Sequence, residues 1–174
     1  VLFRSEAIGN TILLGLWAAA IVASLTAVCA WLVVRRHKGA WMLDQLCSAP
    51  LVFPAIVMAV AMLEIFLNQP LPLYGTLTSI VIASAIHYLP YGMRYSYAGV
   101  LQIHRELEEA GAMSGARQTT IFLRIVVPLV APALVAGGLF VFLVAVKAVS
   151  IPILLAGPKS RVVSIALFDM WQNG

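Results

Sequence analysis

The sequence is poor in charged side chains. Only 10% of its 174 residues are Asp, Glu, Lys or Arg, whereas 62% are hydrophobic. A soluble domain typically carries about 25% charged and about 45–50% apolar residues, so the charged residues here are too few to cover a globule in water. The composition therefore excludes an ordinary cytosolic enzyme and a disordered tail, and it predicts a protein whose solvent is lipid.

Sequence motifs for chemistry are also missing. No Gly-x-x-x-x-Gly-Lys-Ser/Thr phosphate loop occurs, so ATP would have to be hydrolysed on another chain. There is no His-Glu-x-x-His motif, and the two cysteines support no disulfide framework. The residues that could bind a metal are too scattered to form a site: Cys29, Cys47, His37, His87 and His104. We expect no catalytic residue, metal or cofactor in this chain.

Four apolar runs predict helices that cross a membrane. The first, residues 11–34, has 24 residues without a charge, and about 20 suffice to span a bilayer core of about 30 Å. Asn10 is placed to cap this helix. The other runs cover residues 51–67, 76–97 and 121–146. The expected fold class is all-α, a polytopic membrane helical bundle with about four spans present and a fifth expected beyond the end of the sequence.

The positions of the basic residues predict the orientation of these helices. Arg35, Arg36 and Lys38 follow the first run at once, and such clusters lie on the cytoplasmic side of a membrane. The first helix would therefore run from outside to inside. Seven of the 11 basic residues then lie on the inner side: Arg35, Arg36, Lys38, Arg94, Arg105, Arg117 and Arg124.

Three ionisable residues lie within or beside the expected spans. His87 is 11 residues into the third run, about 16 Å deep. Lys147 follows Arg124 by 23 residues, about 35 Å of helix, and so lies near the outer interface. Glu64 is three residues from the outer end of the second run, and its carboxylate can reach the interface. His87 and Lys147 are our candidates for a translocation path, with snorkelling to the interface as the alternative for Lys147.

The ends of the sequence carry a separate expectation. Residues 1–5 begin without Met, and one back-translation of them matches the end of a common sequencing adapter. We therefore treat them as candidate non-native sequence. Residues 6–174 are expected to form a single transmembrane domain that is cut at both ends, with residues 148–174 outside or at the outer interface.

The most polar stretch lies between the third and fourth runs, on the expected cytoplasmic face. We call residues 101–120 the coupling segment. If it is helical, Leu107, Ala110, Gly111 and Ser114 share one face, and its small side chains would let another protein approach the backbone closely. Glu106, Glu108 and Glu109 surround that face, Gly115 permits a sharp bend, and Pro128 falls in the first turns of the next span. This pattern predicts a docking element rather than an active site.

The coupling segment resembles the signature of the membrane subunits of bacterial ATP-binding-cassette importers. That signature is Glu-Ala-Ala, three residues, Gly, nine residues and Ile-x-Leu-Pro. The sequence has Glu109-Ala110-Gly111, then Gly115, then Ile125-x-Val127-Pro128. The spacing is complete, and Gly and Val replace one Ala and the Leu. Asn10-Thr11 and Leu89-Pro90 agree with the resemblance, which covers nearly all of residues 9–174.

The resemblance implies the fold of a type I importer permease whose coupling helices sit in a cleft on a separate ATPase subunit. Glu109 would make polar contact with the ATPase, Gly115 would set the bend, and Ala110 and Ala112 would pack in the cleft. ATP and Mg would be bound by the ATPase. The residues assigned to ATPase coupling are Glu108, Glu109, Ala110, Gly111, Ala112, Gly115 and Pro128.

The implied surroundings are those of an importer in the bacterial inner membrane. The expected partners are the ATPase, a second permease half that is fused or separate, an extracytoplasmic substrate-binding protein and the lipid bilayer, with no nucleic acid. Leu154-Leu155, residues 163–169 and residues 171–174 resemble the second half of ferric-iron-type permeases. Lys147-Ala148 departs from the Arg-Glu of that branch, and polyamine, thiamine and phosphonate permeases remain options.

Two other classes of protein compete with this interpretation. A fragment of an ion-coupled secondary transporter should carry carboxylates near the membrane midplane and broken helices in an inverted repeat, whereas Glu64 is peripheral. A membrane-bound hydrolase is disfavoured because Ser84 and His87, three residues apart on one helix, lack a third orienting group. Association with an ATPase distinguishes the importer, since only that class requires it.

Overall fold

The chain folds into helices. A computed structural model describes residues 2–68 and 73–173, and these residues contain helices and no strand, so the expected all-α class is confirmed. The helices are α1 (Leu2–Val34), α2 (Ala40–Ser48), α3 (Ala55–Asn68), α4 (Leu77–Leu101), α5 (Arg105–Met113), α6 (Gln118–Ile121), α7 (Val127–Lys147), α8 (Pro152–Leu155) and α9 (Val163–Asn173). A 3₁₀ turn over Ala49–Val52 and a π-helical turn over Phe122–Val126 complete the described helical structure.

Helices α1, α4 and α7 pack against one another and form the core. Small residues allow this close packing, as is usual between membrane helices. A methyl group on Gly92 of α4 would overlap Val22 of α1. The hydroxyls of Thr26 and Ser96, 2.8 Å apart, form a buried hydrogen bond between the same two helices. The core therefore relies on close backbone approach and on polar groups that satisfy each other.

Two helical stretches are long and apolar enough to cross a membrane. They are Ser5–Val34 and Gln118–Lys147, each of 30 residues, or about 45 Å of helix. Long apolar helices are thus confirmed where spans are expected, over 11–34 and 121–146. Helix α4, at 25 residues, is long enough but less apolar, so a span over 76–97 stays a prediction.

The second apolar run is not one straight helix. The stretch Ala40–Val52 meets Ala55–Asn68 at 107°, and the break includes Pro54, which lacks a backbone N–H and clashes with the preceding helical turn. Helix α3 has 14 residues, about 21 Å, less than the bilayer core. The pair is a third span only if both parts together cross the membrane. The sequence also predicts an outer loop over 68–75, between the second and third runs, and half of it, residues 69–72, lies outside the described part.

The capping prediction for Asn10 is wrong. Helix α1 begins at Leu2, because the preceding residues continue the helix, and Asn10 lies well inside it. Its side-chain Nδ2 instead donates hydrogen bonds to the carbonyls of Lys159 at 3.2 Å and Arg161 at 3.0 Å. Asn10 therefore joins α1 to the segment before α9.

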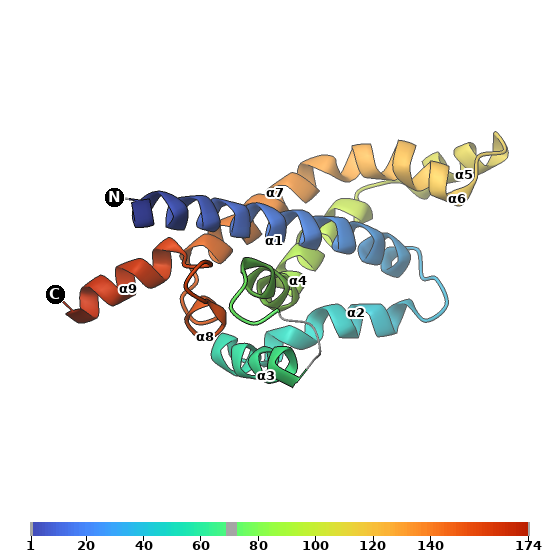
Figure 1. The fold of residues 1–174 in the computed structure, drawn as a ribbon. Helices are drawn as coiled ribbons and strands as arrows, with labels where there is room; N and C mark the ends of the chain where they lie inside the picture. Colours follow the sequence, from blue (N-terminus) through green and yellow to red (C-terminus); the bar gives the residue numbers. More distant parts are fainter. Residues whose placement is uncertain (1, 69–72, 174) are drawn as a thin grey trace.

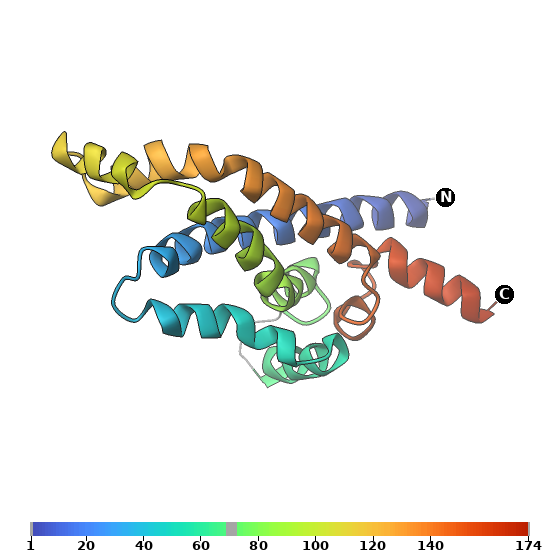
Figure 2. The same cartoon turned by 180° about the vertical axis from the view of Figure 1, so that it is seen from behind.

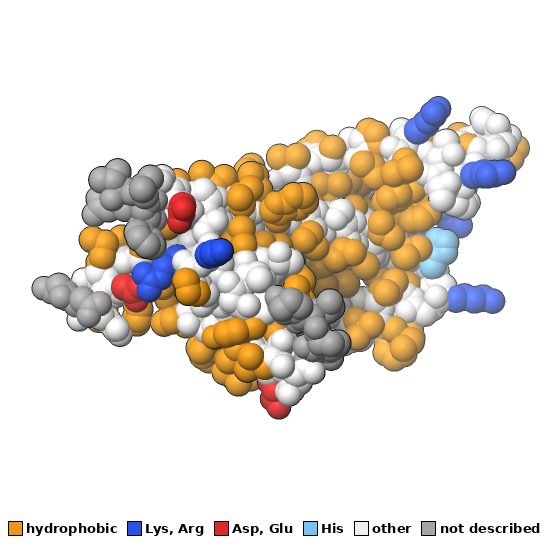
Figure 3. All heavy atoms as spheres, viewed as in Figure 1, with side chains coloured by type: hydrophobic (Ala, Val, Ile, Leu, Met, Phe, Trp, Pro, Cys, Tyr) orange, Lys and Arg blue, Asp and Glu red, His pale blue; other side chains and the backbone are white. Residues whose placement is uncertain are grey.

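The molecule has two polar ends. Both termini lie at one end and α5 and α6 lie at the other (Figures 1 and 2). Hydrophobic side chains cover the middle of the face shown in Figure 3, while Lys, Arg and His side chains gather at the α5–α6 end and a mixed acidic and basic group lies near the termini. An apolar belt between two polar ends is the surface expected of a protein that resides in a membrane.

Candidate functional site

The coupling segment folds as two short helices joined by a tight turn. Helix α5 ends at Met113, α6 starts at Gln118, and Gly115 between them has φ = 82°. Its N–H donates to the carbonyl of Ala112 at 2.9 Å. A Cβ on Gly115 would meet nothing within 4 Å, so glycine is required here by backbone conformation rather than by space. The structure has the bend that the sequence predicts.

The two halves of the signature touch each other. A Cβ on Gly111 would lie 2.9 Å from Cδ1 of Ile125 and 3.3 Å from Cγ1 of Ile121, so α5 lies closely against the start of the next long helix. The π-helical turn that contains Ile125 leads into Pro128, which cannot donate a hydrogen bond to the preceding turn. The spacing of the signature therefore matches a contact between its two halves.

One side of α5 is open. Glu109 and Ala110 are exposed, and Met113 is 90% exposed. Ala112 is exposed as well, but it lies one turn from Glu108 and shares its face of the helix. Nε of Arg105 lies 3.1 Å from Oε1 of Glu109, and both side chains are well exposed, so this ion pair contributes little to stability. The open side combines small side chains, a charge and one exposed methionine, a surface to which another protein can bind.

Glu108 lies on the other side of α5 and attaches it to α1. Its Oε1 accepts a 2.8 Å hydrogen bond from Nε of Arg35, and its Oε2 accepts one of 3.0 Å from Nε1 of Trp31. The Arg35 and Glu108 side chains are only 13% and 11% exposed. Arg35 also donates to the carbonyl of Ile103 at 3.1 Å. We call the contacts among Trp31, Arg35 and Glu108 the α1–α5 tether.

Sequence reasoning grouped Glu108 with Glu106 and Glu109 as charge around an open face. The structure separates them, because neighbouring residues on a helix point about 100° apart. The available signal was the spacing of Trp31 and Arg35, which lie four residues apart on one face of α1 at the end of the first apolar run. That spacing supplies two donors for a single carboxylate.

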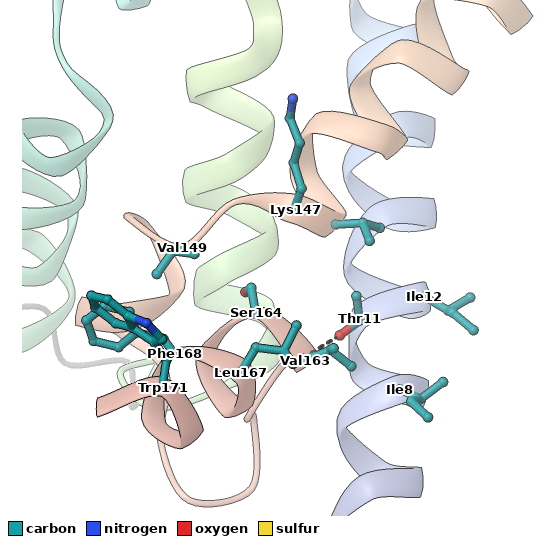
Figure 4. A pocket seen from close by; sticks show the side chains of 11 residues that line it. Ile8, Thr11, Ile12, Lys147, Val149, Val163, Ser164, Leu167, Phe168 and Trp171 are labelled. Carbon is teal, nitrogen blue, oxygen red and sulfur yellow. Dashed lines mark hydrogen bonds between the residues drawn. The ribbon is translucent and has the colours of Figure 1, made fainter. Parts of the chain in front are cut away.

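His87 and Lys147 lie in different surroundings. His87 is half-buried on α4, its ring centre is 5.1 Å from that of Tyr88, and no described residue offers a hydrogen bond to its Nδ1. Lys147 is exposed at the end of α7 and lines an apolar groove of about 610 Å³ between α1, α7 and α9 (Figure 4). His87 does not line that groove, so the structure does not bring the two path candidates into one site.

A hydroxyl fixes the floor of this groove. Oγ1 of Thr11 accepts a 2.9 Å hydrogen bond from the N–H of Val163, the first residue of α9 (Figure 4). It also donates one of 2.7 Å to the carbonyl of Ala7. Together with the hydrogen bonds of Asn10, it attaches the C-terminal segment to α1. Nothing in the local sequence pattern signals these contacts, which join residues about 150 positions apart in the chain.

Comparisons with known proteins agree with this architecture. A model of the family described as "Binding-protein-dependent transport system inner membrane component" matches residues 11–170. The chain is 30% identical over 95% of its length to the ferric transport system permease protein FbpB of Actinobacillus pleuropneumoniae. It is 28% identical over 84% of its length to the Fe(3+)-transport system permease protein FbpB 2 of Haemophilus influenzae.

A relative with a different named substrate also matches. The spermidine/putrescine transport system permease protein PotC of Haemophilus influenzae is 27% identical over 90% of the chain. The chain spans 24% of the A. pleuropneumoniae FbpB, 30% of FbpB 2 and 59% of this PotC. It therefore corresponds to a part of each of these relatives.

Proposed function

Because this chain belongs to the family of binding-protein-dependent transport system inner membrane components, we propose that it acts as one permease half of an ATP-driven importer. In this role it forms part of the translocation path and passes conformational change between a separate ATPase and the membrane helices. The ATPase binds ATP and Mg, and this chain performs no hydrolysis of its own.

The observation that carries this proposal is the two-sided construction of α5. Its open side presents Glu109, Ala110 and Met113, while Glu108, which shares a face with Ala112, is held by two donors from α1. An element that transmits motion has to bind its partner on one side and be firmly attached to the moving helices on the other. Helix α5 meets both requirements.

The distribution of charge supports an orientation in the bacterial inner membrane. Lys and Arg side chains gather at the α5–α6 end (Figure 3), and basic residues beside membrane spans favour the cytoplasm. The α5–α6 end then meets the ATPase. The end with the termini faces outward, where a substrate-binding protein delivers its cargo. A second permease half, fused or separate, completes the path.

For the substrate we propose ferric iron. Two relatives that cover most of this chain are named as ferric or Fe(3+) permeases, and the C-terminal segment resembles that branch. A polyamine is the main competing substrate, because PotC is named for spermidine and putrescine. Thiamine and phosphonate are further options from the same group of permeases.

The experiment that tests docking reverses the charge of Glu109. In the full-length permease, Glu109→Lys should abolish co-purification of the ATPase, because it places a cation in a contact made for a carboxylate. Lys159→Glu, an exposed charge reversal near the opposite end, is the matched control and should co-purify the ATPase at the wild-type level. If Glu109→Lys retains the ATPase and ATP-driven uptake at wild-type levels, the docking assignment is wrong.

The same experiment separates the importer from an ion-coupled secondary transporter. A secondary transporter has no need of an ATPase, so its uptake would persist in vesicles without ATP and would stop when the ion gradient is collapsed. Uptake by an ATP-driven importer would stop without ATP and would persist when the ion gradient is collapsed.

A further inference from the structure

Five polar residues share one face of α4. Ser84, His87, Tyr91, Arg94 and Tyr95 follow one another at intervals of three, four, three and one residues. At about 100° per residue, they fall within a stripe about 100° wide. We call this set the α4 stripe. It extends from the middle of α4 toward the α5–α6 end, on a helix that packs against both α1 and α7, and one edge of the stripe contacts α7.

The deep end of the stripe holds two polar atoms without partners. Ser84 is fully buried, and neither its Oγ nor Nδ1 of His87 has a hydrogen-bond partner among the described residues. A serine inside a helix commonly bonds back to the carbonyl one turn earlier, and Ser84 does not. Unsatisfied buried polar atoms destabilise a fold and call for an explanation, such as water or a passing solute.

The other end of the stripe is exposed. Tyr91 and Tyr95 are 37% and 36% exposed, and Arg94 is exposed as well. Phe140 of α7 packs beside both tyrosine rings, with ring centres 5.5 and 5.8 Å apart, which fixes the rings at the edge of the stripe. Tyr91 and Arg94 are about 15 and about 10 Å of helix from the end of α4 at Leu101. Arg94 can reach the inner interface along its own side chain, as Glu64 can at the outer one. Ser84 and His87 lie deeper, so their unpartnered atoms are what indicate water or a solute along the stripe.

The charge of the stripe restricts what can pass along it. It carries a guanidinium, an imidazole and hydroxyls, and α4 and α7 contain no Asp or Glu, while α1 contains none beyond Glu6. A polyamine that loses its hydration shell here would find no carboxylate on these helices to replace the lost water. An uncompensated charge of this kind is costly for a buried cation. A solute rich in oxygen acceptors and negative charge would instead meet donors, with Arg94 the strongest.

We propose that the α4 stripe lines the translocation path and that it suits an anionic, oxygen-rich solute, such as ferric iron held by oxygen ligands, rather than a free polyamine. This inference rests on the proposed function, because it places the path of that importer on α4. It adds Tyr91, Arg94 and Tyr95 to His87 as residues of the translocation path. Lys147 is not part of this path and lines the groove near the termini.

Cysteine labelling tests whether the stripe faces water. In full-length protein with Cys29→Ala and Cys47→Ala, the variants Tyr91→Cys and Tyr95→Cys are treated in membrane vesicles with a charged, water-soluble methanethiosulfonate reagent. Only the thiolate reacts, and it forms where water is present. Leu139→Cys and Leu143→Cys on α7 are matched controls, because these residues are 59% and 63% exposed on an apolar surface.

The stripe variants should be labelled at least about tenfold faster than the α7 controls, as expected of a thiol that ionises in water compared with one in lipid. Equal, slow labelling of both pairs would overturn the path assignment. The result does not depend on the ATPase. A failed ATPase co-purification with normal stripe labelling would therefore reject the coupling proposal and leave this one standing.

Uptake through the full transporter tests the substrate class. Arg94→Gln should lower the uptake of ferric citrate about tenfold, as expected for loss of one charge-assisted hydrogen bond, while Arg94→Lys should retain most of it. Each Arg94 variant is also prepared in combination with Tyr91→Cys. Labelling of that cysteine shows that the variant still folds and inserts. Uptake of spermidine but not ferric citrate by the wild type, or unchanged ferric uptake by Arg94→Gln, would overturn the anionic assignment.

Discussion

The two polar ends of the molecule are held to α1 by different kinds of contact. At the α5–α6 end an ion pair, Arg35 with Glu108, and an indole N–H attach α5 to α1. At the end with the termini, uncharged side chains, Asn10 and Thr11, bond to backbone groups of the segment that leads into α9. A charged pair therefore attaches α5, which we propose moves during transport. Neutral hydrogen bonds attach the segment before α9.

This difference predicts different consequences when the contacts are cut. An ion pair that is largely buried leaves an uncompensated charge when one partner is removed. A neutral side-chain cap leaves one backbone N–H that water can satisfy. We therefore expect the α5–α6 end to lose function and stability together, and the other end to loosen locally.

The largest effect should come from Glu108→Ala. It leaves Arg35 without its partner, and we expect the free energy of unfolding to fall by about 3 kcal/mol, at the low end for breaking a buried pair. Thermal unfolding of the purified protein in detergent measures it. The control is Arg105→Ala, which removes the exposed pair with Glu109 and should change stability by no more than about 0.5 kcal/mol. Equal effects would show that the tether is no stronger than a surface pair.

A slightly smaller effect is expected from Gly157→Ala, near the termini. A Cβ there would lie 2.6 Å from the carbonyl oxygen of Gly75 and 2.9 Å from its Cα. Because backbone atoms cannot rotate away, we expect a loss of about 2 kcal/mol. Gly138→Ala is the control, since a Cβ on Gly138 would meet nothing within 4 Å. A neutral Gly157→Ala would mean that this loop contact is loose.

Gly115→Ala should act through conformation instead. A positive φ of 82° costs an alanine about 1–2 kcal/mol, and the turn between α5 and α6 should shift to relieve it. We expect weaker ATPase co-purification with an unchanged apolar core. Gly115→Asn should be milder, because asparagine tolerates this backbone region better. If the alanine variant binds the ATPase normally, the bend is not needed for docking.

The smallest effect is expected from Thr11→Val, which removes the cap on the N–H of Val163. The loss should be about 1 kcal/mol and confined to α9, so hydrogen exchange should speed up in that helix and stay unchanged in α5. Thr11→Ser keeps the hydroxyl and serves as the control. Faster exchange throughout the molecule would contradict the separation of the two ends.

Local patterns in the sequence predicted much of the fold. Apolar runs of sufficient length gave α1 and α7, and the bend at Gly115 followed from glycine between two short helical stretches. These features depend on residues close together in the chain. The sequence alone does not predict the break at Pro54, because proline is compatible with either a first helical turn or a sharp bend. Packing decides between these two conformations.

Contacts between distant residues could not be predicted in the same way. The bonds from Asn10 to Lys159 and from Glu108 to Arg35 join residues 149 and 73 positions apart. Such pairs depend on how helices are arranged in space, which a local pattern does not encode. The same holds for the α4 stripe, whose polar residues are visible in the sequence but whose exposure depends on the positions of α1 and α7.

The central claim is that this chain belongs to a transporter driven by ATP. The most direct measurement is uptake of ferric citrate into proteoliposomes that contain the full-length permease, its ATPase and its binding protein, with ATP enclosed. We predict that vanadate stops uptake and that a protonophore leaves it unchanged. Uptake that persists with vanadate and stops with the protonophore would contradict the claim and would identify an ion-coupled transporter.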